Sequence, residues 1–174
     1  DQPRSRGLGD VYKRQNIRLA AEKLRGKDVK PDEFYGMVFQ DSDVAKWIEA
    51  AAYALAAGED PELEKAVDET IQLYGASQHE DGYVDSYFTV KCPDKMWTNI
   101  CDAHELYCAG HMMEAAVAYY EVTGKRELLD IMSKSADCIY EQFMKKNTRA
   151  YPGHPEVELA LMRLWRATGN EKYK

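Results

Sequence analysis

Two cysteines and two histidines recur at helical spacing within one short segment, as Cys101, His104, Cys108 and His111. At about 100° per residue, a continuous helix would place all four side chains within an arc of roughly 80°. Thiol and imidazole groups on one helix face can bind a metal or form hydrogen bonds with a polar ligand. The segment is therefore the most informative stretch of the sequence for function.

Three interpretations of these residues stay open. They could form a buried face whose histidines are satisfied by internal hydrogen bonds. His104 and Cys108, four residues apart, could chelate zinc, although a Cys at position 108 breaks the zincin pattern His-Glu-x-x-His. The interpretation we favour is the floor of a polar pocket in a helical toroid, where histidines bind a hydroxyl-rich ligand.

A second histidine motif follows later, in Gly153-His154-Pro155-Glu156. A side chain at a helix start points toward a rim, where ligands bind, so His154 is a candidate binding residue. Glu156 and Glu158 fall in the first turn of the predicted helix, where carboxylates favour the helix dipole. Five aromatic residues could stack on sugar faces, of which we expect at most two to do so: Trp47, Tyr83, Tyr87, Phe88 and Trp97.

Cysteine use and charge narrow the function classes. The four cysteines form no Cys-x-x-Cys pair and are too sparse for a disulfide-rich scaffold, so we expect reduced, mostly buried thiols. The 174 residues carry 23 basic and 30 acidic side chains, and this acidic balance argues against a nucleic-acid partner. No apolar run approaches the ~20 residues that a membrane span requires. Oligomeric state and localisation are left open.

Residues 1–15 show no helical or strand period and resemble a translated adaptor tail, so we exclude them from the predicted domain. The remaining residues carry a net charge of −9. Helical periodicity begins after Phe39, with predicted helices over residues 41–57, 61–75, 100–122, 128–143 and 154–168. Near residues 80–90, the Asp81-Gly82 turn dipeptide and the aromatic residues after it predict a short hairpin or an ordered loop.

The predicted helices form a repeat. Gly58, Gly124 and Gly169 each end a helix, and a new apolar segment starts four or five residues later. Each unit is one helical hairpin that must stack on its neighbours, and the third unit contains only its first helix. The glycines are 66 and 45 residues apart, too irregular for a solenoid. The predicted fold is therefore all-α, an incomplete (α/α)6 toroid over residues 16–174.

Four segments, in this order, resemble glycoside hydrolase family 127, the β-L-arabinofuranosidase-like proteins. They are Phe39-Gln-Asp-Ser-Asp-Val-Ala-Lys-Trp-Ile-Glu, Asp81-Gly-Tyr-Val-Asp-Ser-Tyr-Phe, His104-Glu-Leu-Tyr-Cys-Ala-Gly-His, and Tyr151-Pro-Gly-His-Pro-Glu-Val-Glu. The resemblance covers residues 16–174 and implies an (α/α)6 catalytic domain, of which this chain would be the N-terminal part.

The resemblance also implies a chemistry. Members of the family are retaining glycosidases in which zinc holds a cysteine thiolate as nucleophile and a Glu acts as acid/base. The matching positions for these groups lie beyond Lys174, so we expect no catalytic residue and no metal ligand in this chain. His104 and His154 match family histidines that contact the arabinofuranose, and His111 is a weaker, adjacent candidate.

The sequence thus indicates a fragment of a zinc-dependent arabinofuranosidase with a carbohydrate substrate, inactive as cut. Another sugar-active (α/α)6 enzyme, such as an unsaturated-uronyl hydrolase or a sugar epimerase, is an alternative. A helical-repeat binding module is a third possibility, which would need a long concave surface and no closed pocket.

Overall fold

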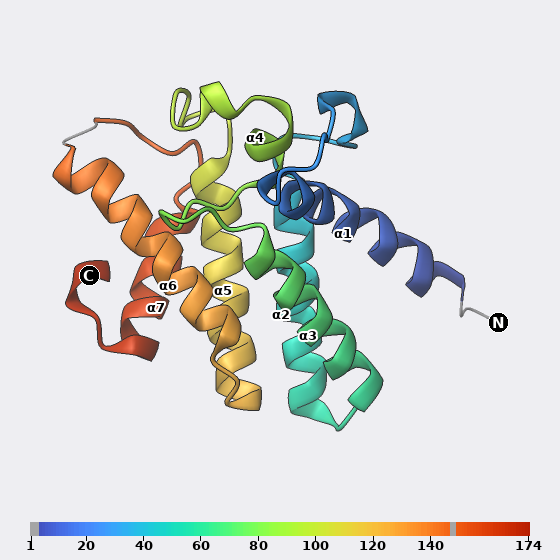
Figure 1. Cartoon of the computed structure of the whole chain (residues 1–174). Helices are drawn as coiled ribbons and strands as arrows, with labels where there is room; N and C mark the ends of the chain where they lie inside the picture. The colour runs from blue at the N-terminus through green and yellow to red at the C-terminus, as the bar shows by residue number, and fades with distance from the viewer. Residues whose placement is uncertain (1–3, 147–148) are drawn as a thin grey trace.

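The computed structural model describes residues 4–146 and 149–174, with side chains from residue 14 onward. These residues form helices and loops and contain no β-strand. The α-helices are α1 (Arg4–Leu24), α2 (Asp41–Ala57), α3 (Pro61–Ala76), α4 (Ser86–Lys91), α5 (Glu105–Thr123), α6 (Glu127–Tyr140) and α7 (Glu156–Thr168), as Figure 1 shows. Short 3-10 turns follow at Pro31–Glu33, Pro93–Lys95 and Glu171–Tyr173, and a π-helical turn at Glu141–Lys145 extends α6.

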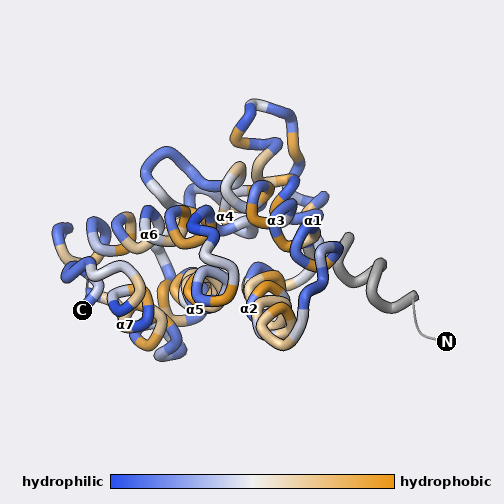
Figure 2. Tube along the Cα trace, turned by 90° about the horizontal axis from the view of Figure 1, so that it is seen from below, coloured by the Kyte–Doolittle hydropathy of each residue, from blue (hydrophilic) through white to orange (hydrophobic). Residues whose placement is uncertain are grey.

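The helices form two layers. Seen along the bundle in Figure 2, α2, α5 and α7 lie side by side in one layer, and α1, α3 and α6 cover one side of it. The three helices of the first layer run in the same direction, so their N-terminal ends meet at one edge of the molecule (Figure 1). The predicted stack of helical hairpins is confirmed: α2 packs against α3, α5 packs against α6, and α7 packs against α5.

Helix α5 is the centre of the core, because it packs against α2 on one side, α7 on the other and α6 behind. Leu106, Met112, Met113, Val117 and Tyr119 are all buried although they point in different directions around this helix. A helix that is apolar on nearly all sides is stable only when other helices surround it. The central position of α5 fixes where the residues at its N-terminal end lie relative to the neighbouring helices.

Two of the three repeat glycines act as helix ends. Gly124 and Gly169 take left-handed φ angles of 73° and 71°, and their N–H groups donate to the carbonyls of Tyr120 and Trp165. Glycine adopts this conformation without steric cost. Gly58 has an extended backbone instead, with φ of 178°.

The segment near residues 80–90 is corrected in part. The ordered loop is confirmed over residues 77–85, but the hairpin alternative is wrong, since Tyr87 and Phe88 lie in helix α4 and Tyr83 lies in the loop before it. The Asp85 side chain accepts a hydrogen bond from the Phe88 N–H at 3.1 Å and so caps α4. A capping carboxylate overrides the strand preference of aromatic and β-branched residues over so short a stretch.

Helix α5 begins at Glu105, five residues later than predicted. Residues 99–103 form a turn in which the Asn99 side chain accepts a hydrogen bond from the Asp102 N–H at 3.2 Å. His104 then takes a left-handed φ of 62°. The prediction that Cys101, His104, Cys108 and His111 share one helix face is therefore wrong, because the first two precede the helix.

At the other end of the chain, α1 begins at Arg4 and takes in most of residues 1–15, for which no regular period was expected. The helix continues into Asn16, Ile17, Ala20 and Ala21, which are buried and anchor it against the bundle. Among the residues that the structure describes, no helix combines the length and the apolar character needed to cross a bilayer.

Candidate functional site

His104 and His154 meet where the N-terminal ends of α5 and α7 come together. Their ring centroids are 5.4 Å apart, although the residues lie 50 positions apart in the sequence. His104 is partly buried and His154 is exposed. His154 precedes α7 by two residues rather than opening it, and it lies at the edge of the helical layer. Two imidazoles at contact distance can bind neighbouring groups of one small ligand.

Tyr107 links these two histidines to His111. The Tyr107 ring lies 5.6 Å from the ring of His104, 5.0 Å from that of His154 and 4.4 Å from that of His111, centroid to centroid. We call these four side chains the imidazole rim. Phe39, which is 36% exposed, flanks it with its ring 5.4 Å from that of His104.

Hydrogen bonding fixes the chemistry that His104 can perform. Its Nδ1 lies 2.6 Å from the carbonyl oxygen of Asp102. Because a carbonyl only accepts hydrogen bonds, Nδ1 must carry a proton and donate it. In the neutral ring Nε2 is then an acceptor, which suits it to a sugar hydroxyl as donor.

His111 is less available than the other two histidines. Its Nδ1 lies 3.3 Å from a carboxylate oxygen of Glu156, and its side chain is 17% exposed. Burial lowers the pKa of the His111 imidazole, and the Lys46 ammonium lowers it further, so the ring is neutral near pH 7. His111 therefore ties α5 to the first turn of α7, behind the two histidines at the edge.

The cysteines of the same segment do not join the rim. Cys101 is exposed in the turn before α5, and Cys108 is buried. Burial raises the pKa of the Cys108 thiol well above its ordinary value, which leaves little thiolate for nucleophilic attack. Among the described side chains, those of residues 14–146 and 149–174, no group of three or more His, Cys, Asp or Glu residues could hold a metal ion.

Two glycines allow α7 to approach α5 closely enough to bring His154 to the rim. A Cβ atom on Gly110 would lie 2.9 Å from Cγ of Glu156 and 3.0 Å from the backbone nitrogen of Val157. A Cβ atom on Gly153 would lie within van der Waals overlap of the Cys101 carbonyl oxygen. Both contacts exclude any larger residue without backbone movement.

A second polar group lies behind the rim and is fully enclosed. We call Asp41, Asp85 and Glu105 the carboxylate cluster; all three are buried. Asp41 accepts hydrogen bonds from the backbone N–H and the hydroxyl of Ser86. Glu105 accepts a hydrogen bond from the Tyr83 hydroxyl at 2.7 Å. It accepts another from the backbone N–H of Trp97, in the loop before α5, at 3.0 Å.

Burial raises the pKa of all three carboxyls, most strongly that of Asp85, and the nearby charge of Asp41 adds to the increase at Asp85. The hydrogen bonds of Asp41 and Glu105 attach the segment between α3 and α5 to the starts of α2 and α5. Tyr83 and Phe88 are buried in the same region, so they are core residues and not sugar-stacking residues.

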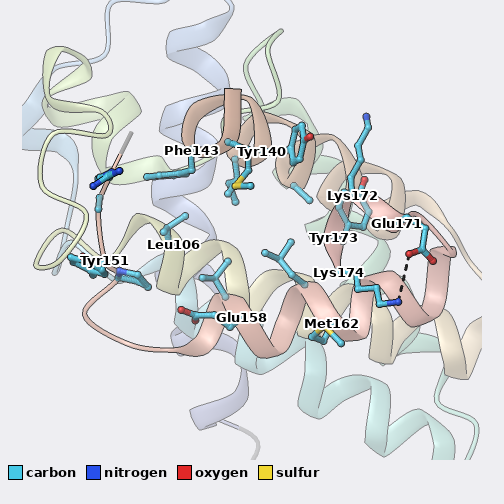
Figure 3. Close-up of a pocket in the computed structure, with 18 residues that line it drawn as sticks. Leu106, Tyr140, Phe143, Tyr151, Glu158, Met162, Glu171, Lys172, Tyr173 and Lys174 are labelled. Carbon is cyan, nitrogen blue, oxygen red and sulfur yellow. Dashed lines mark ion pairs between the residues drawn. The ribbon is translucent and has the colours of Figure 1, made fainter. Parts of the chain in front are cut away.

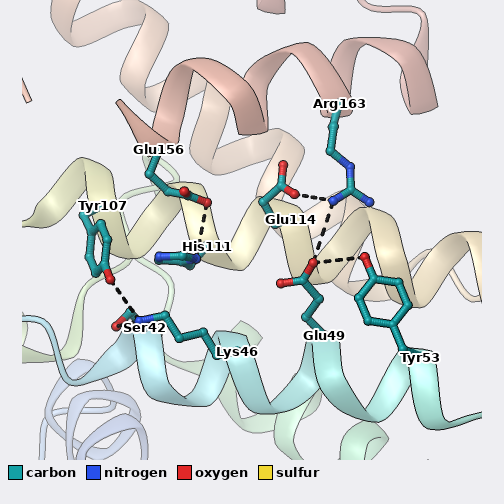
Figure 4. A network of polar contacts seen from close by, with 9 residues as sticks. All are labelled: Ser42, Lys46, Glu49, Tyr53, Tyr107, His111, Glu114, Glu156 and Arg163. Carbon is teal, nitrogen blue, oxygen red and sulfur yellow. Dashed lines mark hydrogen bonds and ion pairs between the residues drawn. The ribbon is translucent and has the colours of Figure 1, made fainter. Parts of the chain in front are cut away.

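A polar network that the sequence analysis missed continues along the same face of α2, α5 and α7 (Figure 4). The Arg163 guanidinium contacts Glu114 closely and lies 3.8 Å from Glu49, to which Tyr53 also donates a hydrogen bond at 3.1 Å. Burial raises the pKa of Glu114, and Arg163 lowers it in part. One sequence signal could have revealed this network, the helical spacing of four polar residues on α2: Ser42, Lys46, Glu49 and Tyr53.

A large groove lies away from the rim. It has a volume of about 790 Å³ and runs between α6, α7 and the C-terminal turn (Figure 3). Apolar side chains line it, among them Leu106, Phe143 and Met162, and none of the three rim histidines does. Its apolar lining resembles a helix-packing surface more than a sugar site.

Comparison with known proteins gives the family. The family model of the β-L-arabinofuranosidase GH127 catalytic domain matches residues 8–174. A non-reducing end β-L-arabinofuranosidase of Bifidobacterium longum subsp. longum is 43% identical in an alignment over 166 residues that covers 91% of this chain and 24% of that protein.

Solved structures agree. The crystal structure of a GH127 β-L-arabinofuranosidase from Geobacillus stearothermophilus T6 matches with a TM-score of 0.82 and 52% identity, over 93% of this chain and 25% of that one. A GH127 β-arabinofuranosidase matches with a TM-score of 0.80 and 33% identity, over 95% and 27%. The chain thus spans about a quarter of the length of these relatives. The hairpin fold, the order of the motifs and these matches together show that the chain belongs to glycoside hydrolase family 127.

Proposed function

We propose that these residues form the N-terminal part of the catalytic domain of a retaining glycosidase that releases arabinofuranosyl groups from glycans or glycoproteins. Family membership supports the reaction class, and the two β-L-arabinofuranosidases similar to the chain support the sugar. In this proposal residues 16–174 supply the first hairpins of the toroid. The groove between α6 and α7 is then the surface on which a following helix packs.

The observation that carries the proposal is the contact between His104 and His154. Helix packing brings two residues from separate motifs to a ring distance of 5.4 Å at an accessible edge. In its neutral form His104 presents Nε2 as an acceptor, because Nδ1 donates to a backbone carbonyl. A furanose ring carries adjacent hydroxyls that two fixed imidazoles can bind together. In the proposal, these residues bind and orient the sugar and transfer no proton.

The nucleophile, the acid/base and zinc are proposed to lie outside these 174 residues. Zinc does not fit the described residues, which offer no cluster of three suitable ligands. Cys108 is unsuited to nucleophilic attack, since burial raises the pKa of its thiol.

The test uses the longer protein that carries these residues, assayed with an aryl β-L-arabinofuranoside. His104→Ala and His154→Ala should each lower kcat/KM by roughly 10- to 1000-fold, equivalent to ~1.4–4 kcal/mol of transition-state binding. His79→Ala is the matched control, because the His79 ring forms its hydrogen bond with the Thr89 hydroxyl, away from the rim. We expect it to leave kcat/KM within about threefold of the starting value.

Two results would contradict the proposal. Unchanged kcat/KM in both rim variants would show that these histidines do not hold the substrate. Activity of the 174 residues alone on the same substrate would show that the catalytic groups lie within this chain.

A further inference from the structure

Tyr107 is the side chain that the three rim histidines share. It comes from the first turn of α5, and its ring meets those of His104 and His111 almost at right angles, at 90° and 88°. The ring of His154 packs on it at 45°. Edge-to-face aromatic contacts restrict ring orientation as well as distance. Tyr107 is thus placed to hold His104 and His154 relative to each other.

A second contact fixes Tyr107 itself. The ammonium group of Lys46, from α2, donates a hydrogen bond to the Tyr107 hydroxyl at 2.9 Å, and it lies 3.3 Å from Oγ of Ser42 (Figure 4). The three elements that meet at the rim, α2, α5 and the start of α7, are therefore connected through one phenol. A charge-assisted bond of this kind is stronger than one between neutral groups.

On the basis of the proposed function, we infer that Tyr107 is a positioning residue that fixes the mutual orientation of His104 and His154, and that Lys46 acts through it. The ring of Tyr107 carries most of this role, since it makes the three aromatic contacts. The hydroxyl adds the anchor to α2. Because a displacement of about 1 Å in a binding group can cost 10²-fold in rate, loss of the ring should be costly.

The first test compares Tyr107→Leu with Tyr107→Phe in the longer protein. Tyr107→Leu should lower kcat/KM by roughly 10- to 100-fold, and Tyr107→Phe should recover it to within about fivefold, because phenylalanine keeps the ring. Tyr120→Leu is the control: it makes the same substitution near the far end of α5, where the ring contacts Arg126. Activity of Tyr107→Leu equal to that of the control would overturn the inference. Activity of Tyr107→Phe as low as that of Tyr107→Leu would also overturn it, since the hydroxyl would then be the essential group.

A second readout separates positioning from general stability. In NMR spectra of the free protein, the NOEs between the rings of His104 and His154 should weaken in Tyr107→Leu and persist in Tyr107→Phe and Tyr120→Leu. Unchanged NOEs between the two histidine rings in Tyr107→Leu would overturn the inference.

Lys46→Met tests the anchor without disturbing the ring. It should lower kcat/KM about three- to tenfold alone and have no further effect when Tyr107 is already Phe, because residues that act through one contact are not additive. Full additivity of the two substitutions would show that Lys46 acts elsewhere.

His104→Ala distinguishes this inference from the proposed function. If His104→Ala loses activity and Tyr107→Leu does not, only the inference fails; if His104→Ala keeps activity, the proposed function fails.

Discussion

His104 and Glu105 are neighbours in the sequence but belong to two polar regions with opposite properties. His104 joins the imidazole rim, which includes the exposed His154. Glu105 joins the carboxylate cluster, which is buried and bonded to loop residues from inside the protein. Both regions are rich in titratable groups, so the density of such groups does not identify a binding site. The exposed ring of His154, and the Nε2 of a neutral His104 as an acceptor, distinguish the rim.

The two regions should also contribute differently to the free energy of unfolding. Buried carboxylates that accept backbone and hydroxyl protons stabilise the fold, because their loss leaves those donors unpaired. The exposed imidazole of His154 contributes little to folding and remains available to a ligand. Substitutions in the carboxylate cluster should therefore change stability, and substitutions in the rim should change binding.

The largest effect on stability is expected for Glu105→Ala. It would leave the Tyr83 hydroxyl and the Trp97 N–H without their acceptor, at a cost of about 2–5 kcal/mol in the free energy of unfolding. Urea unfolding would measure this change, and hydrogen exchange of the segment around Trp97 should become faster. Glu158→Ala, at an exposed position on α7, is the control and should stay within about 0.5 kcal/mol. Equal stability of the two variants would remove the distinction between the regions.

The next largest effect is expected for Gly110→Ala. The new methyl group would collide with the first turn of α7, so we expect a loss of about 1–3 kcal/mol in stability and a displaced His154. Gly58→Ala is the matched control, because a Cβ atom there has no heavy atom within 4 Å among the described residues and the backbone is extended. If both substitutions have the same effect in thermal unfolding, the close approach of α5 and α7 is not what places His154.

The carboxylate cluster also predicts a pH dependence. The pKa of Asp85 is raised well above its ordinary value of 3.8 by burial, so the folded protein holds this proton at pH values where the unfolded chain has released it. Stability should therefore fall as pH rises above about 4, by up to about 1.4 kcal/mol per pH unit for this group. Asp85→Asn should flatten the profile of urea midpoints against pH. An unchanged slope in that variant would assign the dependence to other groups.

The smallest effect on stability is expected for His154→Ala. The imidazole is exposed, so the free energy of unfolding should change by less than about 0.5 kcal/mol. A decrease of more than about 2 kcal/mol in the free energy of unfolding, measured with urea, would show that His154 stabilises the fold.

Much of the fold follows from the sequence, because its signals are local. Gly124 and Gly169 end helices by their left-handed backbone, and Asp41 stands at the start of α2 as predicted. Helical periodicity in α6 and α7 marks one apolar face on each. The start of α5 was misplaced because the Asn99 turn and the left-handed backbone at His104 interrupt an apparently continuous helical pattern.

The site was harder to predict than the fold. The resemblance of two motifs to a known family indicated His104 and His154, and nothing in their spacing showed that their rings touch. Lys46 and Tyr107 were missed because their contact joins two helices 61 residues apart in the sequence. Such a pair forms only when α2 packs against α5. The local sequence around either residue does not specify that packing.

One measurement tests the central claim that the rim, and not the carboxylate cluster or the outer surface, holds the sugar. The histidine ring signals of the longer protein are followed by NMR during titration with a β-L-arabinofuranoside, with assignments from His→Ala variants. We predict that the signals of His104 and His154 shift together with one dissociation constant, while that of His79 stays in place. Unmoved signals of His104 and His154 at saturating ligand would contradict the account.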